Sequence, residues 1–385
     1  MKVCMLSYSF YENDARVRCA AESLSKRGDT VDVICLNKGN QSRWNCLNGV
    51  NIYRIKERNL NEKRKTDYIL RLLSFFFLSS FFILKLFIQK KYEVFHIHNI
   101  PDFLVFTAFI PKLFGSKIIL DIHDIMPEFY IQKFNASQDH ILVKLLKLIE
   151  KISMVFANHV LVSNDIWKKI LATRSIPEKK ITVILNAPDD SYFHYQKKSN
   201  RKRDYFTLLY PGSLKDHFGV DIAIRAIDVL KYHIPNVHFE IVGQGPLYND
   251  LLNLVKKLNL EKLITFHESV TIEEIPEFFA HADIGIVPKR RGIFSDNALS
   301  GKLLEFVKMG IPSIVSKTPV EKLYFNEDMV MFFEPEDPND LARCVIELYN
   351  NPEKRKKLIQ NATQFNKNHD REIYNRMYFQ VIDSF

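Results

Sequence analysis

Two charged side chains near the start of an expected helix suggest a binding site for an anion. Lys302 and Glu305 fall in the first turn of this helix, directly after the small-residue stretch 295–301. Free backbone N–H groups and the positive end of the helix dipole favour a negative ligand there, and a lysine adds a full charge. Phosphate is therefore the expected ligand, and Glu305 can accept hydrogen bonds from an attached ribose diol. A structural role for Glu305, in which its charge favours the helix dipole, fits the spacing equally well.

The element that positions these residues is predicted to be a helix followed by a buried parallel strand. Apolar residues recur at helical spacing through 302–309, and Gly310 is placed for the left-handed conformation that ends a helix. The run 311–315 is short and apolar, as a buried strand would be. The pattern therefore predicts a helix packed on a sheet, with the charged pair at its amino end.

The stretch 304–314, LEFVKMGIPSI, resembles a motif of the retaining glycosyltransferases of the GT-B fold, in particular family 4. In that family a Glu-x7-Glu motif leads into LEAMAxGxPVI, and the first glutamate would fall at Asn297. A subset of the family with SxxALxxKLLEY is more similar, so we interpret Asn297 as a variant, with Asp296 beside it. The resemblance implies that Asp296 and Asn297 belong to the catalytic site.

The resemblance also implies that the second half of the chain binds a nucleotide-diphosphate sugar. Two turns, 211–214 and 243–246, match glycine turns of the family, and such glycines allow the backbone to approach a ligand closely. Ser213 stands where the family usually has a basic residue, which leaves Lys215 and His217 as substitutes. The residues expected to bind the donor are Gly212, Ser213, Lys215, Gly243, Gly245, Arg291, Leu299, Ser300, Gly301, Lys302 and Glu305.

Histidine and carboxylate side chains follow two strand-like runs in the first half, 92–98 and 118–123. Both runs match stretches of the family subset that look like HxHNxPD and LDxHDxxPE. A single histidine on a strand is usually a packed core residue, but three at neighbouring strand ends favour a role in positioning hydroxyls and neutralising charge. We expect His123 to be catalytic. The residues expected on the acceptor side are Asn13, Arg16, His98, Asn99, Asp102, Asp124 and Glu128.

The chain opens with a predicted strand, helix and strand at 2–8, 15–27 and 30–36. The loop after the first strand lies where open α/β sheets bind ligands, although it lacks the glycines of a dinucleotide-binding fingerprint. In the family this loop faces the acceptor, which is why Asn13 and Arg16 are candidates. A solvated helix face is the alternative role for Arg16.

The composition is that of a folded protein with an acidic partner. The 385 residues suffice for two domains, and the net charge of +9 suits nucleic acid, anionic lipid or a phosphorylated small molecule. No nucleic-acid-binding motif is present, and the five scattered cysteines predict neither a zinc site nor disulfides. We expect no metal, because no Asp-x-Asp site is evident, and no tightly bound cofactor. A cytoplasmic location is expected, because the sequence opens without a signal-peptide pattern.

The segment 69–88 is almost entirely apolar, with basic residues at 63–65 and at 90–91. By length it could cross a bilayer, for which about 20 residues suffice. However, the next strand, at 93–98, must join the same sheet as the strands before the segment, so a crossing is not expected. We expect peripheral, monotopic contact with the anionic inner face of the cell membrane, and burial within the domain is the alternative.

The fold expected from these patterns is α/β, of the GT-B type, with two doubly wound Rossmann-like domains facing a central cleft. Residues 1–190 would form the acceptor-side domain and 204–367 the nucleotide-sugar-binding domain. The charged stretch 197–203 is the expected linker, and a helix within 368–385 is expected to pack back on the first domain.

The expected function is transfer of a sugar, with retention, from a nucleotide-diphosphate sugar to a lipid-linked or polysaccharide acceptor in cell-surface glycan biosynthesis. A UDP-sugar is the favoured donor. Two alternatives remain: another GT-B nucleotide-sugar enzyme such as an epimerase or a phosphorylase, and a non-catalytic partner of a membrane or of another transferase. Product analysis separates the enzymes, because an epimerase consumes the nucleotide sugar without an acceptor.

Overall fold

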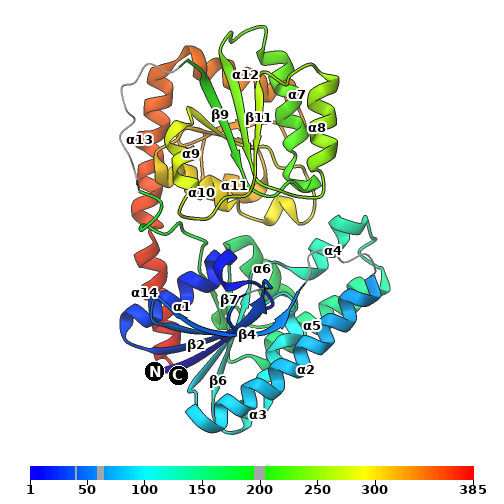
Figure 1. Cartoon of the computed structure of the whole chain (residues 1–385), viewed down its shortest axis with the longest axis vertical. Helices are drawn as coiled ribbons and strands as arrows, with labels where there is room; N and C mark the ends of the chain where they lie inside the picture. The colour runs from blue at the N-terminus through cyan, green and yellow to red at the C-terminus, as the bar shows by residue number, and fades with distance from the viewer. Residues whose placement is uncertain (40, 59–64, 195–203) are drawn as a thin grey trace. The chain divides into compact units, whose positions relative to one another are not determined.

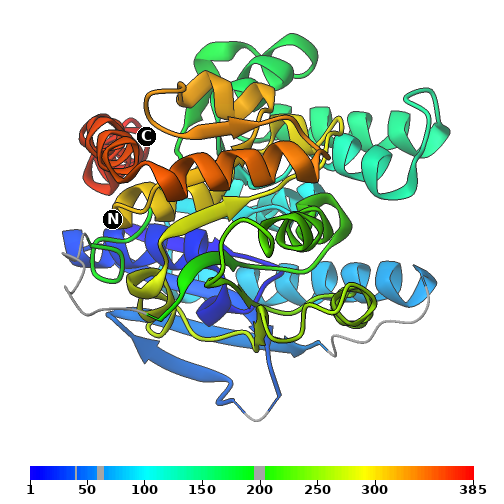
Figure 2. The same ribbon diagram turned by 90° about the horizontal axis from the view of Figure 1, so that it is seen from above.

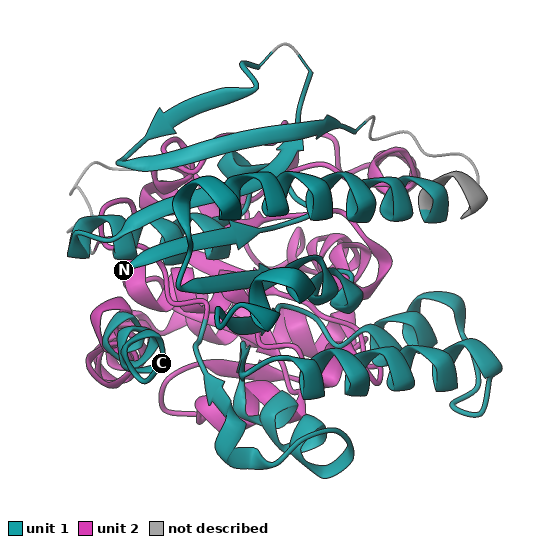
Figure 3. Cartoon of the chain, turned by 90° about the horizontal axis from the view of Figure 1, so that it is seen from below, with its two compact units in different colours: residues 1–185, 374–385 teal, residues 186–373 magenta. Residues whose placement is uncertain are grey.

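The structure is a computed structural model that describes residues 1–39, 41–58, 65–194 and 204–385. The chain divides into two compact units, which Figure 3 distinguishes by colour. Unit 1 contains residues 1–185 and 374–385, and unit 2 contains residues 186–373. The linker expected at 197–203 and the basic residues Lys63 and Arg64 lie outside the described residues.

Unit 1 is built on a sheet in which, among the described residues, eight strands follow the order β3-β4-β2-β1-β5-β6-β7-β8 (Figure 1). All neighbours pair in parallel except β3 and β4, which are antiparallel. The strands are β1 (Lys2–Leu6), β2 (Thr30–Asn37), β3 (Trp44–Leu47), β4 (Val50–Glu57), β5 (Val94–His98), β6 (Lys117–Ile122), β7 (His159–Val162) and β8 (Ile181–Val183).

Helices cover both faces of this sheet. They are α1 (Ala15–Arg27), α2 (Lys65–Lys90), α3 (Phe109–Leu113), α4 (Met126–Phe134), α5 (Ile141–Phe156), α6 (Asp165–Arg174) and α14 (Arg371–Asp383), with 3₁₀ turns η1 (Tyr11–Asn13), η2 (Asp102–Ala108) and η3 (Glu178–Lys180). Side chains of α1 and α14 share one apolar core with the central strands, and this core includes Leu24, Tyr378 and Ile382. The other face carries α2, η2 and α5, as Figure 3 shows from below.

The first helix begins and ends where the sequence predicts. The Asp14 side chain accepts a hydrogen bond from the Val17 backbone at 3.2 Å, which satisfies one of the unpaired N–H groups at the helix start. Gly28 ends the helix in the left-handed region, with φ of 100°, where glycine carries no steric cost. The loop before α1 therefore leaves β1 in a defined direction and places Arg16 in the first turn of the helix.

Helix α2 is long and apolar enough to cross a membrane by length and composition, a test that core helices of soluble proteins also pass. The strands on either side of it in the chain, β4 and β5, belong to one sheet, as the sequence argument required. One face of α2 is buried, through Leu72, Phe75 and Ile83. Its opposite face leaves large apolar side chains exposed, among them Phe77 and Phe81.

Three elements of unit 1 were not predicted. The hairpin of β3 and β4 adds an antiparallel edge, and β3 is short, largely exposed and partly polar, so it carries no clear strand pattern. Helix α5 follows the strand, loop and helix that were predicted from residue 118 onward, and no helix was predicted in its stretch. In α5 the charged residues Lys144, Lys147, Glu150 and Lys151 recur at helical spacing among apolar ones, so the sequence carried a helical signal that the prediction did not use.

Unit 2 repeats the doubly wound pattern with an all-parallel sheet whose order, within the described residues, is β11-β10-β9-β12-β13-β14. The strands are β9 (Phe206–Pro211), β10 (Val237–Val242), β11 (Ile264–His267), β12 (Ile284–Val287), β13 (Ser313–Ser316) and β14 (Met331–Phe333). The helices are α7 (Val220–Leu230), α8 (Tyr248–Lys257), α9 (Ile275–His281), α10 (Gly301–Met309), α11 (Pro319–Tyr324), α12 (Pro338–Asn350) and α13 (Pro352–Asn368), with η4 (Asp216–Phe218) and η5 (Ser295–Asn297).

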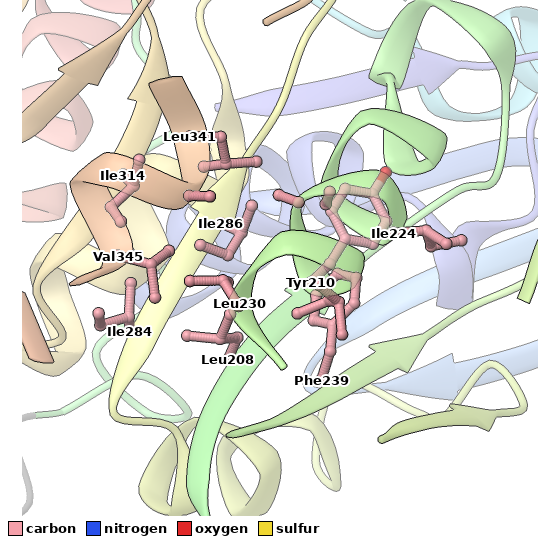
Figure 4. Close-up of a cluster of buried hydrophobic side chains, with 14 of the residues drawn as sticks. Leu208, Tyr210, Ile224, Leu230, Phe239, Ile284, Ile286, Ile314, Leu341 and Val345 are labelled. Carbon is pink, nitrogen blue, oxygen red and sulfur yellow. The ribbon is translucent and has the colours of Figure 1, made fainter. Parts of the chain in front are cut away.

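The main core of unit 2 lies between the sheet and the helices α7, α8 and α12 (Figures 1 and 2). Figure 4 shows Leu208, Ile286 and Ile314 from three neighbouring strands among side chains of α7 and α12 such as Leu230 and Val345. On the other face α9 and α10 pack together through Phe279 and Phe306, whose ring centroids are 4.9 Å apart. This packing holds α10 against β12 and β13.

Candidate functional site

In unit 1 the expected polar residues gather around Asp121, a buried carboxylate at the end of β6. Arg16 binds it with two hydrogen bonds, from Nε to Oδ2 at 2.8 Å and from Nη2 to Oδ1 at 2.7 Å. Oδ2 also lies 3.3 Å from His98 Nδ1 and 3.5 Å from His123 Nε2. His98 Nδ1 and His123 Nε2 are themselves 3.0 Å apart. The ends of β5 and β6 thus place two of the expected histidines on one carboxylate.

The charges in this cluster set the protonation of its members. Burial disfavours the charge on Asp121, but Arg16 and His123 outweigh it and hold the pKa of this carboxyl well below its usual range. Burial also disfavours a charged His123, and the attraction of Asp121 exceeds that effect, so the pKa of His123 is raised. Burial and the neighbouring His96 lower the pKa of His98 to about 3. His123 is therefore the histidine of this group that carries a proton most readily.

His96 connects this cluster to the C-terminal helix. Its Nδ1 lies 2.7 Å from the hydroxyl of Tyr378 in α14, and its Nε2 lies 3.6 Å from Asp121 Oδ2. His96, His98 and Asp121 are close enough together to ligate one metal ion. Both oxygens of Asp121 already accept hydrogen bonds from Arg16, so we interpret the group as a hydrogen-bonded cluster.

Asn99 fixes the backbone that carries His123. Its side-chain oxygen accepts a hydrogen bond from the His123 N–H at 2.7 Å, and its NH₂ group donates to the Asp124 carbonyl at 2.8 Å and to Asp102 Oδ1 at 2.7 Å. Asn99 is buried, and its amide forms hydrogen bonds with other groups of the protein. Burial and the charge of Glu150 raise the pKa of Asp102 to about 7.

The remaining acceptor-side candidates differ in accessibility. Asn13 is exposed at the end of η1, and Asp124 is half-buried after β6. Glu128 is buried in α4, and its carboxylate accepts two hydrogen bonds from Arg174, which also binds Glu150. Glu128 therefore joins α4 to α5 and α6 through an ion cluster.

In unit 2 the start of α10 places Lys302 above the turn that follows β9. The Lys302 ammonium lies 3.9 Å from the ring centroid of Phe218 and 5.3 Å from that of Tyr210. A Cβ added to Gly212, where φ is 143°, would lie 2.1 Å from Lys302 Cε, so a side chain there would strain the backbone and displace this lysine. In the described part of the chain Lys302 has no ion-pair partner within 4 Å, and burial lowers its pKa to about 8.

Glu305 is half-buried one turn beyond the start of α10. Burial raises the pKa of its carboxyl to about 7, against the opposing charge of Lys302. Ser300 is the N-cap residue of α10, and its side chain makes no capping hydrogen bond. The first-turn N–H groups, Lys302 and Glu305 together provide donors, a cation and an acceptor at one helix end, which is the set a ribose-linked phosphate requires.

The loop that enters α10 is held by a buried ion pair that the sequence did not reveal. Lys289 Nζ lies 2.7 Å from Glu321 Oε1 and donates to the carbonyls of Ser295 at 3.0 Å and Ala298 at 2.7 Å. Glu321 Oε1 also accepts from the Ser300 N–H at 3.3 Å. From the sequence, the basic run 289–291 predicts added charge beside the phosphate position. Instead the charge of Lys289 is neutralised by Glu321, and the pair shapes the loop.

The two arginines after Lys289 are also paired. Arg290 binds both oxygens of Asp221 at 2.7 Å. Arg291, expected to bind the donor, forms an ion pair with the expected catalytic residue Asp296 at 2.9 Å. Asn297 donates from Nδ2 to the Ile293 carbonyl at 2.8 Å. The pairing of Arg291 with Asp296 leaves Lys302 as the cation closest to the helix start.

The two glycines after β10 are required by protein contacts rather than by open space. A Cβ on Gly243, where φ is 147°, would lie 2.1 Å from the Gly212 carbonyl oxygen, and one on Gly245 would lie 2.4 Å from that of Leu214. The turn after β10 therefore packs directly on the turn after β9. Ser213 and Lys215 are exposed on that turn, and burial together with the charge of Lys215 lowers the pKa of His217 to about 4.

Two residues that organise these sites, Asp121 and Glu321, were absent from the predicted set. Asp121 is the one charged residue inside the apolar run 118–122, and that was the available signal. Lys289 and Glu321 are far apart in sequence and carry no local pattern, so their pairing is visible only in the fold.

The family follows from two matches that together extend from residue 16 to residue 365. The model for glycosyltransferase family 4 matches residues 16–192, and that for glycosyl transferases group 1 matches residues 192–365. The chain belongs to these glycosyltransferases, and the two Rossmann-like units are those of the GT-B fold. The fold class and the enzyme class predicted from the sequence are therefore confirmed.

Individual relatives are distant. The chain is 26% identical over 270 residues to the O-antigen biosynthesis glycosyltransferase WclY of Escherichia coli, covering 66% of this chain and 69% of that protein. It is 28% identical over 165 residues to an uncharacterized glycosyltransferase of Methanocaldococcus jannaschii, covering 43% of this chain and only 44% of that relative. Anabaena HepE in complex with UDP-glucose aligns over both whole chains with a TM-score of 0.75 and 15% identity.

Proposed function

We propose that this chain is a retaining glycosyltransferase that takes a UDP-sugar and transfers the sugar to a lipid-linked or polysaccharide acceptor in cell-surface glycan assembly. The observation that carries the donor half of this proposal is the start of α10, where Lys302 and Glu305 accompany free N–H groups. HepE is a structural neighbour whose complex contains UDP-glucose, which supports a uridine nucleotide. WclY is an O-antigen transferase, which supports a cell-surface glycan as product.

The roles of the residues follow from their charges. Lys302 would neutralise the diphosphate as the bond to the sugar breaks, and Glu305 would accept hydrogen bonds from the ribose hydroxyls. His123, the most readily protonated histidine of the Asp121 cluster, would act on the sugar as charge develops. We propose no protein nucleophile, because the leaving phosphate can assist the incoming acceptor hydroxyl on the same face of the sugar.

Donor choice can be tested by thermal unfolding with UDP, GDP and ADP. A ligand present at 100 times its dissociation constant stabilises a protein by about 2.7 kcal/mol. We expect the largest stabilisation with UDP. A larger stabilisation by GDP or ADP would contradict the choice of donor.

Retention can be tested with a UDP-sugar and a lipid-linked acceptor prepared from the native glycan. NMR of the product should show the same anomeric configuration as the donor. An inverted product would contradict a retaining reaction, and consumption of the nucleotide sugar without an acceptor would favour the epimerase.

We further propose a cytoplasmic protein that contacts the inner face of the membrane through the exposed side of α2 without crossing it. Phe77 and Phe81 are each 68% exposed on that side, and residues 68–92 contain no acidic side chain. Basic residues near an anionic surface contribute about 1 kcal/mol each, and buried phenylalanines add to this. Co-sedimentation with vesicles of phosphatidylcholine and phosphatidylglycerol at low salt should recover the protein in the pellet. Its complete retention in the supernatant would contradict the contact.

A further inference from the structure

Helix α5 carries a second exposed apolar surface. Its exposed side chains include Ile141, Leu145, Leu148, Ile152 and Val155, which we call the α5 stripe. Their spacing of four, three, four and three residues places them along one side of the helix. Leu148 is 53% exposed and Ile141 73% exposed. A stripe of this kind normally faces a core, so its exposure calls for a partner.

The opposite side of α5 is firmly attached to unit 1. Val143, Ser153 and Met154 are buried there. Glu150, also buried, binds Arg174 of α6 through Oε2 at 2.6 Å. The helix is therefore held with its stripe outward, and turning the stripe into the core would break a buried ion pair.

Aromatic contacts join α5 to α2 through the short elements between them. Phe156 at the end of α5 stacks on Phe109 of α3 with centroids 6.2 Å apart. Just beyond α3, Phe114 lies 6.3 Å from Phe87 of α2. Phe109 and Phe114 are 52% and 76% exposed. Helices α2 and α5 both contact η2 on one face of the sheet of unit 1, and the aromatic rings of α3 and of Phe114 link one helix to the other.

The charges that border this surface are positive except for that of Asp139, which lies before α5 and is 3.5 Å from Lys144. Lys144, Lys147 and Lys151 lie along one edge of the α5 stripe, and the one acidic residue of α5, Glu150, is buried. Lys112 of α3 lies over the ring of Phe156, with its ammonium 4.2 Å from the centroid. Apolar side chains bordered by lysines match the interface of an anionic bilayer, where acyl chains lie below negative headgroups.

We propose that the α5 stripe inserts into an anionic lipid bilayer beside α2, so that unit 1 docks on the membrane through both helices. This inference rests on the proposed contact of α2 and extends it to a second, independent segment. The two helices fix the tilt of unit 1 on the surface, which one helix would leave free to rotate. The acceptor-side cluster around Asp121 is then held at a constant height above the lipid.

A second copy of the chain fits this surface less well. In a two-fold dimer the same patch meets itself, so the lysines bordering the α5 stripe would approach the identical lysines of the other copy. Such like-charge contacts destabilise an interface, whereas anionic headgroups neutralise the same lysines.

The test uses vesicles of phosphatidylcholine with one third phosphatidylglycerol and four full-length proteins, the parent and three variants. One variant carries Leu145→Gln, Leu148→Gln and Ile152→Gln, and another carries Phe77→Gln and Phe81→Gln in α2. The control is Tyr232→Gln, which removes an exposed aromatic ring from unit 2. All substituted side chains are exposed, so thermal unfolding should change little.

We expect the α5 variant to lose about tenfold or more in vesicle partition, because three apolar side chains no longer enter the lipid. The control should partition like the parent protein. Equal partition of parent and α5 variant would overturn this inference while leaving the α2 contact intact. Failure of the parent protein itself to bind would overturn both.

A second measurement locates the α5 stripe directly. Leu148→Trp should show a blue-shifted emission with vesicles and quenching by lipids brominated on their acyl chains. Emission that brominated lipid does not change would contradict insertion. Self-association through the α5 stripe, measured by sedimentation equilibrium without vesicles, would contradict it too.

Discussion

The side-chain oxygen of Asn99 accepts a hydrogen bond from the backbone N–H of His123 at 2.7 Å. The same amide donates to the carbonyl of Asp124, so both backbone groups beyond β6 are fixed by one side chain from the end of β5. Asn99 was expected to contact the acceptor, but its amide is buried and turned toward this loop. We propose that it acts on the reaction through the position of His123.

Replacing Asn99 by alanine should therefore lower turnover more than binding. The buried N–H of His123 loses its partner, which costs about 1 to 3 kcal/mol in stability. A displaced His123 should lower kcat by about tenfold to a hundredfold, and the affinity for UDP should stay within twofold, because Asn99 lies outside unit 2. Steady-state kinetics beside calorimetry with UDP measures both. Loss of UDP affinity with unchanged kcat would contradict the positioning role.

The pair Lys289 and Glu321 should be as important for donor binding as the residues it positions. Glu321→Ala leaves a buried lysine without its partner and should destabilise unit 2 by about 3 to 5 kcal/mol. The double variant Lys289→Met with Glu321→Leu removes both charges and should recover much of that stability. If the pair shapes the loop before α10, the stable double variant should still bind UDP more weakly than the parent. Parent-like affinity in that variant would limit the pair to a structural role.

The affinity for UDP should peak between about pH 7 and pH 8. Burial raises the pKa of Glu305 to about 7, so this carboxylate is lost as an acceptor when the pH falls through that value. Burial lowers the pKa of Lys302 to about 8, so its charge is lost as the pH rises through that value. Calorimetry from pH 6 to pH 9 tests both limbs.

Glu305→Gln is the matched control for this profile, because the titration of UDP itself is common to both proteins. In the variant, the affinity for UDP should lose the part of its decrease at acid pH that arises from protonation of Glu305. Its decrease at alkaline pH should remain. An identical profile in both proteins would show that Glu305 does not titrate in the nucleotide site.

The parts of the fold that were predicted have local signals. The helix 15–27 carries its own cap and its own terminating glycine, and Gly310 ends α10 with φ of 68°, as its place in the sequence predicted. Most of the parallel strands of both sheets are short, largely apolar runs. The presence of these helices and strands could therefore be predicted from residues close together in the sequence.

The parts that were missed depend on contacts between distant residues. Helix α5 is an exception, because its charged residues recur at helical spacing and this local signal was present in the sequence. The ion pair of Arg16 with Asp121 joins residues 105 positions apart, and that of Lys289 with Glu321 joins the loop after β12 to helix α11. Which charged residues are neutralised inside the protein, and which remain for a ligand, follows only from such pairings.

The central claim is a division of labour, in which Glu305 and Lys302 hold the nucleotide and His123 acts on the transferred sugar. Titration of UDP into the parent protein, Glu305→Ala and His123→Ala by calorimetry tests it most directly. Glu305→Ala should weaken binding by about 2 to 4 kcal/mol, because charge-assisted hydrogen bonds to the ribose are lost. His123→Ala should bind UDP like the parent, yet lower turnover by about a hundredfold or more. Parent-like affinity for UDP in Glu305→Ala would contradict the assignment of the nucleotide site to the start of α10.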